Sequence, residues 1–186
     1  MAGVLQRLSV FETEAATRAR MREVADTTMA VLLRERQYAP NGHWYWYYSL
    51  GEAIPNDLAH AGYIIHGIHL YAAHGGRLAS KFPLPTVRAH LADYEGGSSW
   101  PITEWPKFRT DVSVPARTYD IGMGLFLVCT LGLDETVSTS MLQALSHYRE
   151  SDGSYLKQPR GFASVPIVVR EYETYVLLGL AACERR

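Results

Sequence analysis

The sequence predicts an all-α protein made of three helical hairpins, each with an outer and an inner helix. One observation is a glycine-aromatic motif that recurs as Asn41-Gly42-His43-Trp44-Tyr45, Gly97-Ser98-Ser99-Trp100 and Asp152-Gly153-Ser154-Tyr155. Its glycines, at positions 42, 97 and 153, are 55 and 56 residues apart. A fixed period indicates one supersecondary unit used repeatedly. The other observation is that amphipathic and apolar helical segments alternate along the chain.

The outer helix of each unit is amphipathic. Apolar residues recur at helical spacing, with charged residues on the other face, over residues 12–36, 85–94 and 134–149. The second of these begins with Pro85, as helices often do. We expect each outer helix to face solvent on one side.

The inner helices, residues 58–73, 116–131 and 168–183, are apolar nearly all round, which predicts burial on all sides. They share an early tyrosine and a later glycine between hydrophobic residues; these are Tyr63, Tyr119 and Tyr172, and Gly67, Gly124 and Gly179. Because glycine is costly inside a helix, its repeated use there indicates closely packed inner helices.

Size and composition limit the class of protein. The 186 residues fit one domain, 1–186, with units of about 12–80, 81–132 and 133–186. A net charge of −1 without a basic block argues against nucleic-acid binding. No apolar run is long enough to span a membrane, and we see no signal-peptide pattern. We expect a cytoplasmic protein in which Cys129 and Cys183 are reduced thiols inside apolar helices.

Several cofactor and metal motifs are absent from the sequence. It has no P-loop, Gly-x-Gly-x-x-Gly, Gly-x-Ser-x-Gly or paired-cysteine motif, so we expect no cofactor. His60, His66, His69 and His74 invite a metal hypothesis. At about 100° per residue, however, His60 and His69 point to opposite sides of one helix, so we expect no metal site.

Charged residues at the start of the first inner helix are the best candidates for proton transfer. Asp57 and His60 are three residues apart and share a helix face. A carboxylate beside an imidazole can orient the ring and raise its basicity, which makes a general base. The alternative is structural: Asp57 complements the helix dipole and His60 is simply hydrogen bonded.

The other two inner helices begin with the pattern Arg-x-Tyr-acid, as Arg117-Thr118-Tyr119-Asp120 and Arg170-Glu171-Tyr172-Glu173. The simpler interpretation is a repeated ion pair within the helix. A compatible interpretation is a cationic site for a carboxylate or phosphate, with Tyr119 placed for proton transfer. The expected substrate-binding residues from these segments are Arg117, Asp120, Arg170, Glu171 and Glu173.

Aromatic residues cluster in the run Trp44-Tyr45-Trp46-Tyr47-Tyr48. Its alternation is strand-like, so one set of rings packs in the core and the other is available to stack on a ligand. We take Trp44, Trp46 and Trp100 as candidate substrate-binding residues. Core packing alone is an equally weighted alternative.

The outer-loop-inner pattern resembles the (α/α) toroids, which occur in many carbohydrate-active and cyclase-type enzymes. The segment Ile54-Pro55-Asn56-Asp57-Leu58-Ala59-His60-Ala61-Gly62-Tyr63, with His66, is loosely similar to the C-terminal domain of glucuronyl C5-epimerases. There, Pro-Asn-Leu-Ala-Arg leads to a tyrosine and a histidine. His60 stands where that family has arginine, and the spacing to His66 differs. The resemblance implies proton transfer by His60 and Tyr63 and binding of a uronate carboxylate by Arg117.

Common toroids close with six hairpins, whereas this chain has three. The hairpins either close into a smaller bundle or are completed by a second copy in a homodimer, since an open half-ring would expose apolar surface.

The function expected from the sequence is that of a carbohydrate-processing enzyme. It would be an epimerase, lyase or hydrolase acting on an acidic sugar or polysaccharide, with Asp57, His60, Tyr63 and Tyr119 as catalytic residues. The alternatives are a non-catalytic helical-repeat binding module, half of a larger assembly, and a small-molecule cyclase or isomerase.

Overall fold

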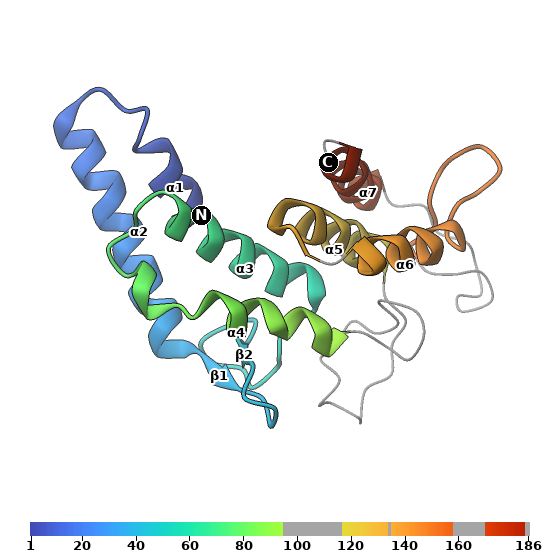
Figure 1. The fold of residues 1–186 in the computed structure, drawn as a ribbon, viewed down its shortest axis with the longest axis horizontal. Coiled ribbons are helices and arrows are strands. Elements are labelled where there is room, and N and C mark those ends of the chain that lie inside the picture. The colour runs from blue at the N-terminus through green and yellow to red at the C-terminus, as the bar shows by residue number, and fades with distance from the viewer. Residues whose placement is uncertain (95–116, 134, 158–169, 185–186) are drawn as a thin grey trace. The chain divides into compact units, whose positions relative to one another are not determined.

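The computed structural model describes residues 1–94, 117–133, 135–157 and 170–184 (Figure 1). These residues form seven α-helices, two short 3-10 helices and one two-stranded antiparallel sheet. In chain order they are α1 (Ala2–Leu8), α2 (Ala15–Glu35), β1 (Gln37–Tyr38), β2 (Trp44–Tyr45), α3 (Leu58–Ala73), η1 (Ala79–Lys81), α4 (Leu84–Ala89), η2 (His90–Tyr94), α5 (Thr118–Leu131), α6 (Glu135–Ser146) and α7 (Arg170–Glu184). The prediction of a mostly helical protein is confirmed, while the toroid stays a prediction.

The helices correspond closely to those expected from the hydrophobic pattern. α2 and α6 take the places of two outer helices, and α4 with η2 takes the place of the third. α3, α5 and α7 are the three inner helices. The short helix α1 was not predicted. None of the helices in the described ranges is both long and apolar enough to cross a bilayer.

The chain divides into two compact units. The first comprises Met1–Asn56 and Tyr63–His90, and the second comprises Asp57–Gly62 and Leu91–Arg186. The boundary passes through the first turns of α3, so the start of this helix belongs to the second unit.

The first unit packs α1 closely against α3. A Cβ added to Gly3 would overlap the carbonyl oxygen of Gly67, so the two backbones meet there. The core beneath them includes Met29 of α2 and Tyr71 of α3, both almost fully buried. Glycine at position 3 is therefore a requirement of this helix contact.

The second unit is centred on α5, which is buried along almost its whole length. A Cβ at Gly122 would lie 2.5 Å from the backbone carbonyl of Tyr175 on α7, and one at Gly179 would lie 2.5 Å from the carbonyl oxygen of Gly122. Close packing of inner helices is therefore found between α5 and α7, at Gly179 as expected and at Gly122, which was not among the three predicted glycines; the predicted Gly67 instead meets Gly3 of α1. Burial on all sides is wrong for α7, because Leu177 is 64% exposed.

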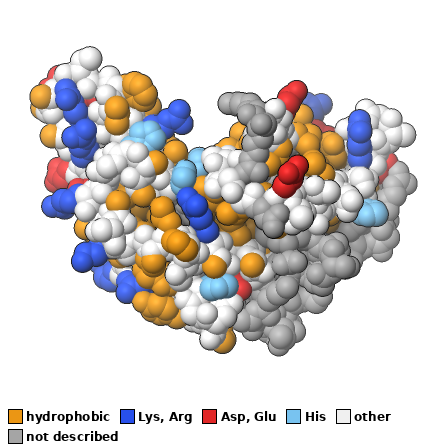
Figure 2. Space-filling model, viewed as in Figure 1, with side chains coloured by type: hydrophobic (Ala, Val, Ile, Leu, Met, Phe, Trp, Pro, Cys, Tyr) orange, Lys and Arg blue, Asp and Glu red, His pale blue; other side chains and the backbone are white. Residues whose placement is uncertain are grey.

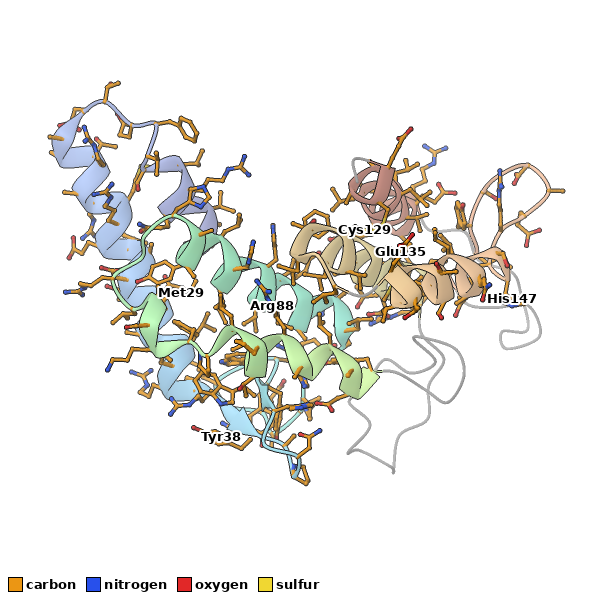
Figure 3. All side chains as sticks on the ribbon, viewed as in Figure 1. Met29, Tyr38, Arg88, Cys129, Glu135 and His147 are labelled. Carbon is orange, nitrogen blue, oxygen red and sulfur yellow. A yellow bond between two sulfur atoms is a disulfide. The ribbon has the colours of Figure 1, made fainter. Side chains whose placement is uncertain are left out.

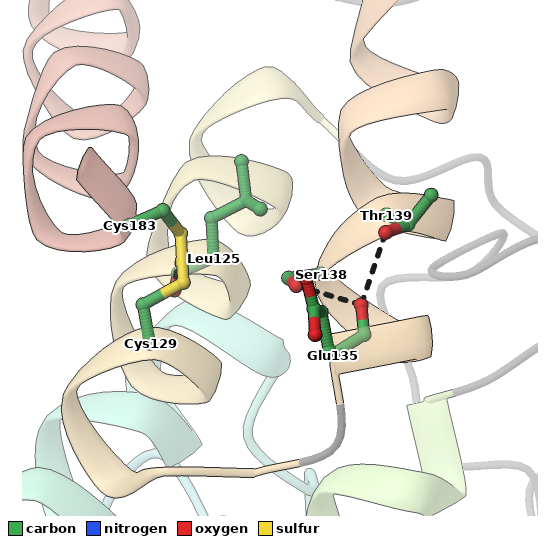
Figure 4. The surroundings of a disulfide bond; sticks show 6 residues. All are labelled: Leu125, Cys129, Glu135, Ser138, Thr139 and Cys183. Atoms are coloured by element: carbon green, nitrogen blue, oxygen red, sulfur yellow. Dashed lines mark hydrogen bonds between the residues drawn. A yellow bond between two sulfur atoms is a disulfide. The ribbon is translucent and has the colours of Figure 1, made fainter. Parts of the chain in front are cut away.

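The two cysteines form a disulfide, contrary to the expectation of reduced thiols. Cys129 of α5 and Cys183 of α7 are bonded across 54 residues of sequence, with their Cα atoms 5.0 Å apart (Figure 4). The expectation failed because an apolar helical context describes each cysteine alone and does not reveal which helices are neighbours.

Two copies of the glycine-aromatic motif adopt the same turn. In the first, Ala39 N–H donates to the His43 carbonyl and Gly42 N–H donates to the Ala39 carbonyl; in the third, Glu150, Ser154 and Gly153 make the corresponding bonds. An Asx side chain supports both turns: the Asn41 side chain accepts from His43 N–H, and that of Asp152 accepts from Ser154 N–H. Gly42 and Gly153 have φ of 83° and 89°. The copy around residue 97 lies outside the described residues.

Candidate functional site

A group of five polar side chains surrounds the start of α3, all within the second unit. Its centre is Asp57, which immediately precedes the helix and is 1% exposed. One carboxylate oxygen, Oδ1, accepts from the backbone N–H of His60 at 2.9 Å and lies 2.6 Å from His60 Nδ1. Asp57 is thus both the N-terminal cap of α3 and the partner of the His60 ring.

The other carboxylate oxygen of Asp57 binds residues that are about 60 positions later in the sequence. Oδ2 accepts from Arg117 Nη2 at 2.5 Å and from the Tyr119 hydroxyl at 2.5 Å. Both donors stand at the start of α5. The two helix starts are therefore joined through one buried carboxylate.

Asp120 forms a second buried link between the same two helix starts. It is 0% exposed, and its Oδ1 accepts from the backbone N–H of Ala59 at 3.1 Å. Its Oδ2 accepts from the backbone N–H and the Nε of Arg117 at 3.2 and 3.3 Å. Arg117 thus bridges two carboxylates, which offsets the cost of burying each negative charge.

Tyr119 is a hydrogen-bond donor in this arrangement. Burial raises the pKa of its hydroxyl far above the ordinary value, and the negative charge of Asp120 and the hydrogen bond to Asp57 raise it further. The tyrosine ring packs against Tyr172 of α7 with centroids 4.8 Å apart, and the Arg117 guanidinium lies 4.3 Å from its centroid. The hydroxyl is therefore neutral and donates its proton to the hydrogen bond with Asp57.

His60 differs from its partners in its exposure. Its side chain is 47% exposed, whereas the carboxylate that holds its Nδ1 is almost completely buried. The geometry is that of an imidazole oriented by a carboxylate and open to solvent, a combination suited to proton transfer.

The other predicted residues differ in their partners and exposure. Glu173 of α7 accepts a hydrogen bond from the backbone N–H of Tyr155 at 3.1 Å. Arg170 is exposed at the start of α7. Tyr63 is 44% exposed and follows His60 by three residues on α3. Trp100 and the side chain of Glu171 lie outside the described part of the chain.

Trp44 and Trp46 are the set of rings that packs into the core of the first unit. Trp44 is 9% exposed and packs against Tyr38 and Phe82, while the guanidinium of Arg36 lies 4.7 Å from its ring centroid. Trp46 is 3% exposed, and its Nε1 donates to the Leu32 carbonyl at 2.8 Å. Neither ring is available at the surface to stack on a flat ligand.

Sequence reasoning missed the support for the start of α5. Thr118 donates from Oγ1 to the Leu156 carbonyl at 2.9 Å and from its backbone N–H to the Lys157 carbonyl at 3.1 Å. Both acceptors follow the third glycine-aromatic turn. The sequence feature that could have indicated this contact is the glycine-aromatic motif. It marked the loop around Gly153 as equivalent to the loop before α3.

A second group of basic side chains lies in the first unit, on α3 and α4. Arg88 Nη2 lies 2.9 Å from His69 Nδ1. Burial lowers the pKa of His69 below its usual value, and the charges of Arg88 and His74 lower it further. Within the described ranges, no three His, Cys, Asp or Glu side chains are grouped so as to hold a metal ion.

Comparison with known proteins gave no match: no protein-family model fits the chain, and no curated protein or solved structure shows significant similarity to it.

Proposed function

We propose that the chain is an acid/base enzyme in which His60 transfers a proton and Asp57 orients it, and that its substrate is an acidic sugar or polysaccharide. One observation carries the proposal: a half-exposed imidazole is held at 2.6 Å by a carboxylate that is 1% exposed. A carboxylate that orients an imidazole open to solvent is an arrangement suited to general-base catalysis.

The proposed chemistry follows from the hydrogen bonds of Asp57. Because its Oδ1 accepts from Nδ1, the neutral ring carries its proton on Nδ1, and Nε2 is the nitrogen that acts as the base in this proposal. The carboxylate also stabilises the imidazolium that forms when Nε2 takes a proton. Arg117 and Tyr119 hold the other oxygen, so Asp57 keeps one orientation during the transfer.

The substrate class rests on the resemblance described above, and two arginines are the candidates for binding its carboxylate. The side chain of Arg117 is 21% exposed and already binds Asp57 and Asp120. Only its remaining N–H groups can therefore donate to a ligand. Arg170 is exposed and is the second candidate for a substrate carboxylate.

The test is solvent-proton exchange into a panel of uronate-containing oligosaccharides in D2O, followed by mass spectrometry. We expect incorporation of deuterium or turnover by the wild type. His60→Ala should lower the rate by roughly two to four orders of magnitude, the usual contribution of a general base. Asp57→Asn should also lower it. His147→Ala removes an exposed histidine of the same unit and should leave the rate unchanged.

Two results would contradict the proposal. Full activity of both His60→Ala and Asp57→Asn would remove the proton-transfer assignment. Saturable binding of an oligosaccharide by the wild type, with neither exchange nor turnover, would favour a binding module.

We also propose that two copies of the chain form a homodimer. Support comes from the exposed face of α7, where Leu177 is 64% and Leu178 is 42% exposed, since monomers seldom expose neighbouring large apolar residues on a helix expected to be internal. Analytical ultracentrifugation should show a dimer that Leu177→Glu weakens. A strict monomer at high concentration would reject the proposal.

A further inference from the structure

The basic group of the first unit has no part in the proposed chemistry. Arg88 of α4, labelled in Figure 3, donates from Nη2 to Nδ1 of His69 on α3 at 2.9 Å. A guanidinium has no acceptor, so the lone pair of the neutral His69 ring lies on Nδ1 and its proton on Nε2. The pair therefore offers several N–H donors and no remaining acceptor.

Arg88 lacks an acidic partner within the part of the chain that the structure describes. The ion pairs found there involve other arginines, and the Nε of Arg88 is buried with no hydrogen-bond acceptor. A buried guanidinium N–H without an acceptor is costly. A negatively charged ligand beside the guanidinium would supply the counter-charge that Arg88 lacks.

The side chains that lower the pKa of His69 are basic. The pKa of His69 is lowered by burial, then by Arg88 and His74. The pKa of His66, three residues earlier on α3, is lowered by burial, then by His69 and by Arg7 of α1. Figure 2 shows histidine atoms next to a Lys or Arg side chain in this region of the surface. The lowered pKa values keep these histidine rings neutral near pH 7, so the fixed positive charge of the pair is the Arg88 guanidinium, which attracts anions.

We propose that His69 and Arg88 form a binding site for an oxyanion of the phosphate type. Arg88 supplies the charge and at least one guanidinium N–H, and the Nε2–H of His69 supplies a second donor. A charge-assisted hydrogen bond from guanidinium to phosphate is among the stronger polar contacts in proteins. The site lies in the first unit and is independent of the proposed role of His60.

The experiment titrates the full chain with inorganic phosphate against chloride at constant ionic strength, by calorimetry and by NMR of the imidazole nitrogens. We expect phosphate to bind and to move the His69 resonances, which are assigned by their loss in His69→Gln. Arg88→Gln should weaken phosphate binding at least about ten-fold, since it removes a charged hydrogen-bond donor. Arg88→Lys should retain part of the affinity.

Arg34→Gln is the matched control, because Arg34 is exposed and pairs with Glu35 elsewhere in the first unit. It should bind phosphate as the wild type does. The proposal is overturned if the wild type shows no preference for phosphate over chloride, or if Arg88→Gln keeps the wild-type affinity. If Arg88→Gln does not fold, the NMR titration of the wild type decides, and His69 resonances that phosphate leaves unmoved overturn the proposal as well.

Discussion

At the residue scale, Asp57 joins the folding and the proposed chemistry of the second unit. Its carboxylate caps α3, orients His60 and receives two donors from α5. Each of these bonds fixes the carboxylate that the proposed base needs. Asp57 can therefore both stabilise the start of α3 and orient the proposed base. Turnover by the Asp57→Asn variant tests the second role.

A second buried polar contact, that of Tyr71, predicts a pH dependence of stability. Tyr71 is 0% exposed, donates to Asp26 and accepts from the backbone N–H of Leu78 at 2.9 Å. Burial and the hydrogen bond to Asp26 raise the pKa of its hydroxyl from 10.0 to about 12. Since the folded state disfavours the tyrosinate, this contribution to stability is complete below pH 10 and is lost as the pH rises to about 12.

We therefore expect the free energy of unfolding to fall more steeply between pH 10 and about 12 in the wild type than in Tyr71→Phe. The difference in slope should approach about 1.4 kcal/mol per pH unit. Urea unfolding at several pH values measures it. Tyr38→Phe, which changes a tyrosine that is 58% exposed, is the control and should follow the wild type. Parallel curves for Tyr71→Phe and the wild type would contradict the assignment.

The sequence predicted a contact between two side chains only where the two residues are close together in the sequence. Asp57 and His60 were paired in advance because residues three apart on a helix share a face. The bonds from Arg117 and Tyr119 to Asp57 were not predicted, since they join residues about 60 positions apart. For Trp44 and Trp46, alternation showed that the two rings share a side without showing that this side is the core.

At the scale of elements, hydrophobic periodicity predicted where the helices lie in the sequence. It did not predict which helices pack against each other. The predicted ranges 58–73 and 134–149 correspond to α3 (Leu58–Ala73) and α6 (Glu135–Ser146). The disulfide depends on α5 lying beside α7, which no local pattern reveals. The exposure of Leu177 was missed for the same reason, because an apolar segment does not show which of its faces is covered.

The contact between α5 and α7 gives a prediction about glycine. Gly122→Ala should destabilise the protein by about 1–3 kcal/mol, because its Cβ would meet the backbone of α7 at 2.5 Å and backbone cannot move aside cheaply. Gly67→Ala is the matched control: nothing lies within 4 Å of its Cβ, so it should stabilise α3 by roughly 0.5–1 kcal/mol. Urea unfolding measures the free energy of unfolding of both variants. A Gly122→Ala variant as stable as the wild type would show that α5 and α7 are not in close contact.

At the scale of the whole molecule, the division into two units predicts where the disulfide acts. Cys129 and Cys183 both belong to the second unit, and the bond closes a span of 54 residues. By the chain-entropy relation, its loss removes roughly 4 kcal/mol of stability. In the variant carrying Cys129→Ala and Cys183→Ala, we expect amide hydrogen exchange to become faster in α5 and α7. α2, which belongs to the first unit, should keep its protection.

Reduction of the wild type with a thiol is the control for this pair of substitutions, since it breaks the bond without changing any side-chain volume. The reduced protein and the double variant should both lose amide protection in α5 and α7 and keep it in α2. In each case the same constraint on the unfolded chain of the second unit is absent. Mass spectrometry of peptides from α2, α5 and α7 reports the three regions in one experiment. An equal loss of protection in α2 would mean that the two units unfold together, and that the disulfide stabilises the chain as one cooperative structure.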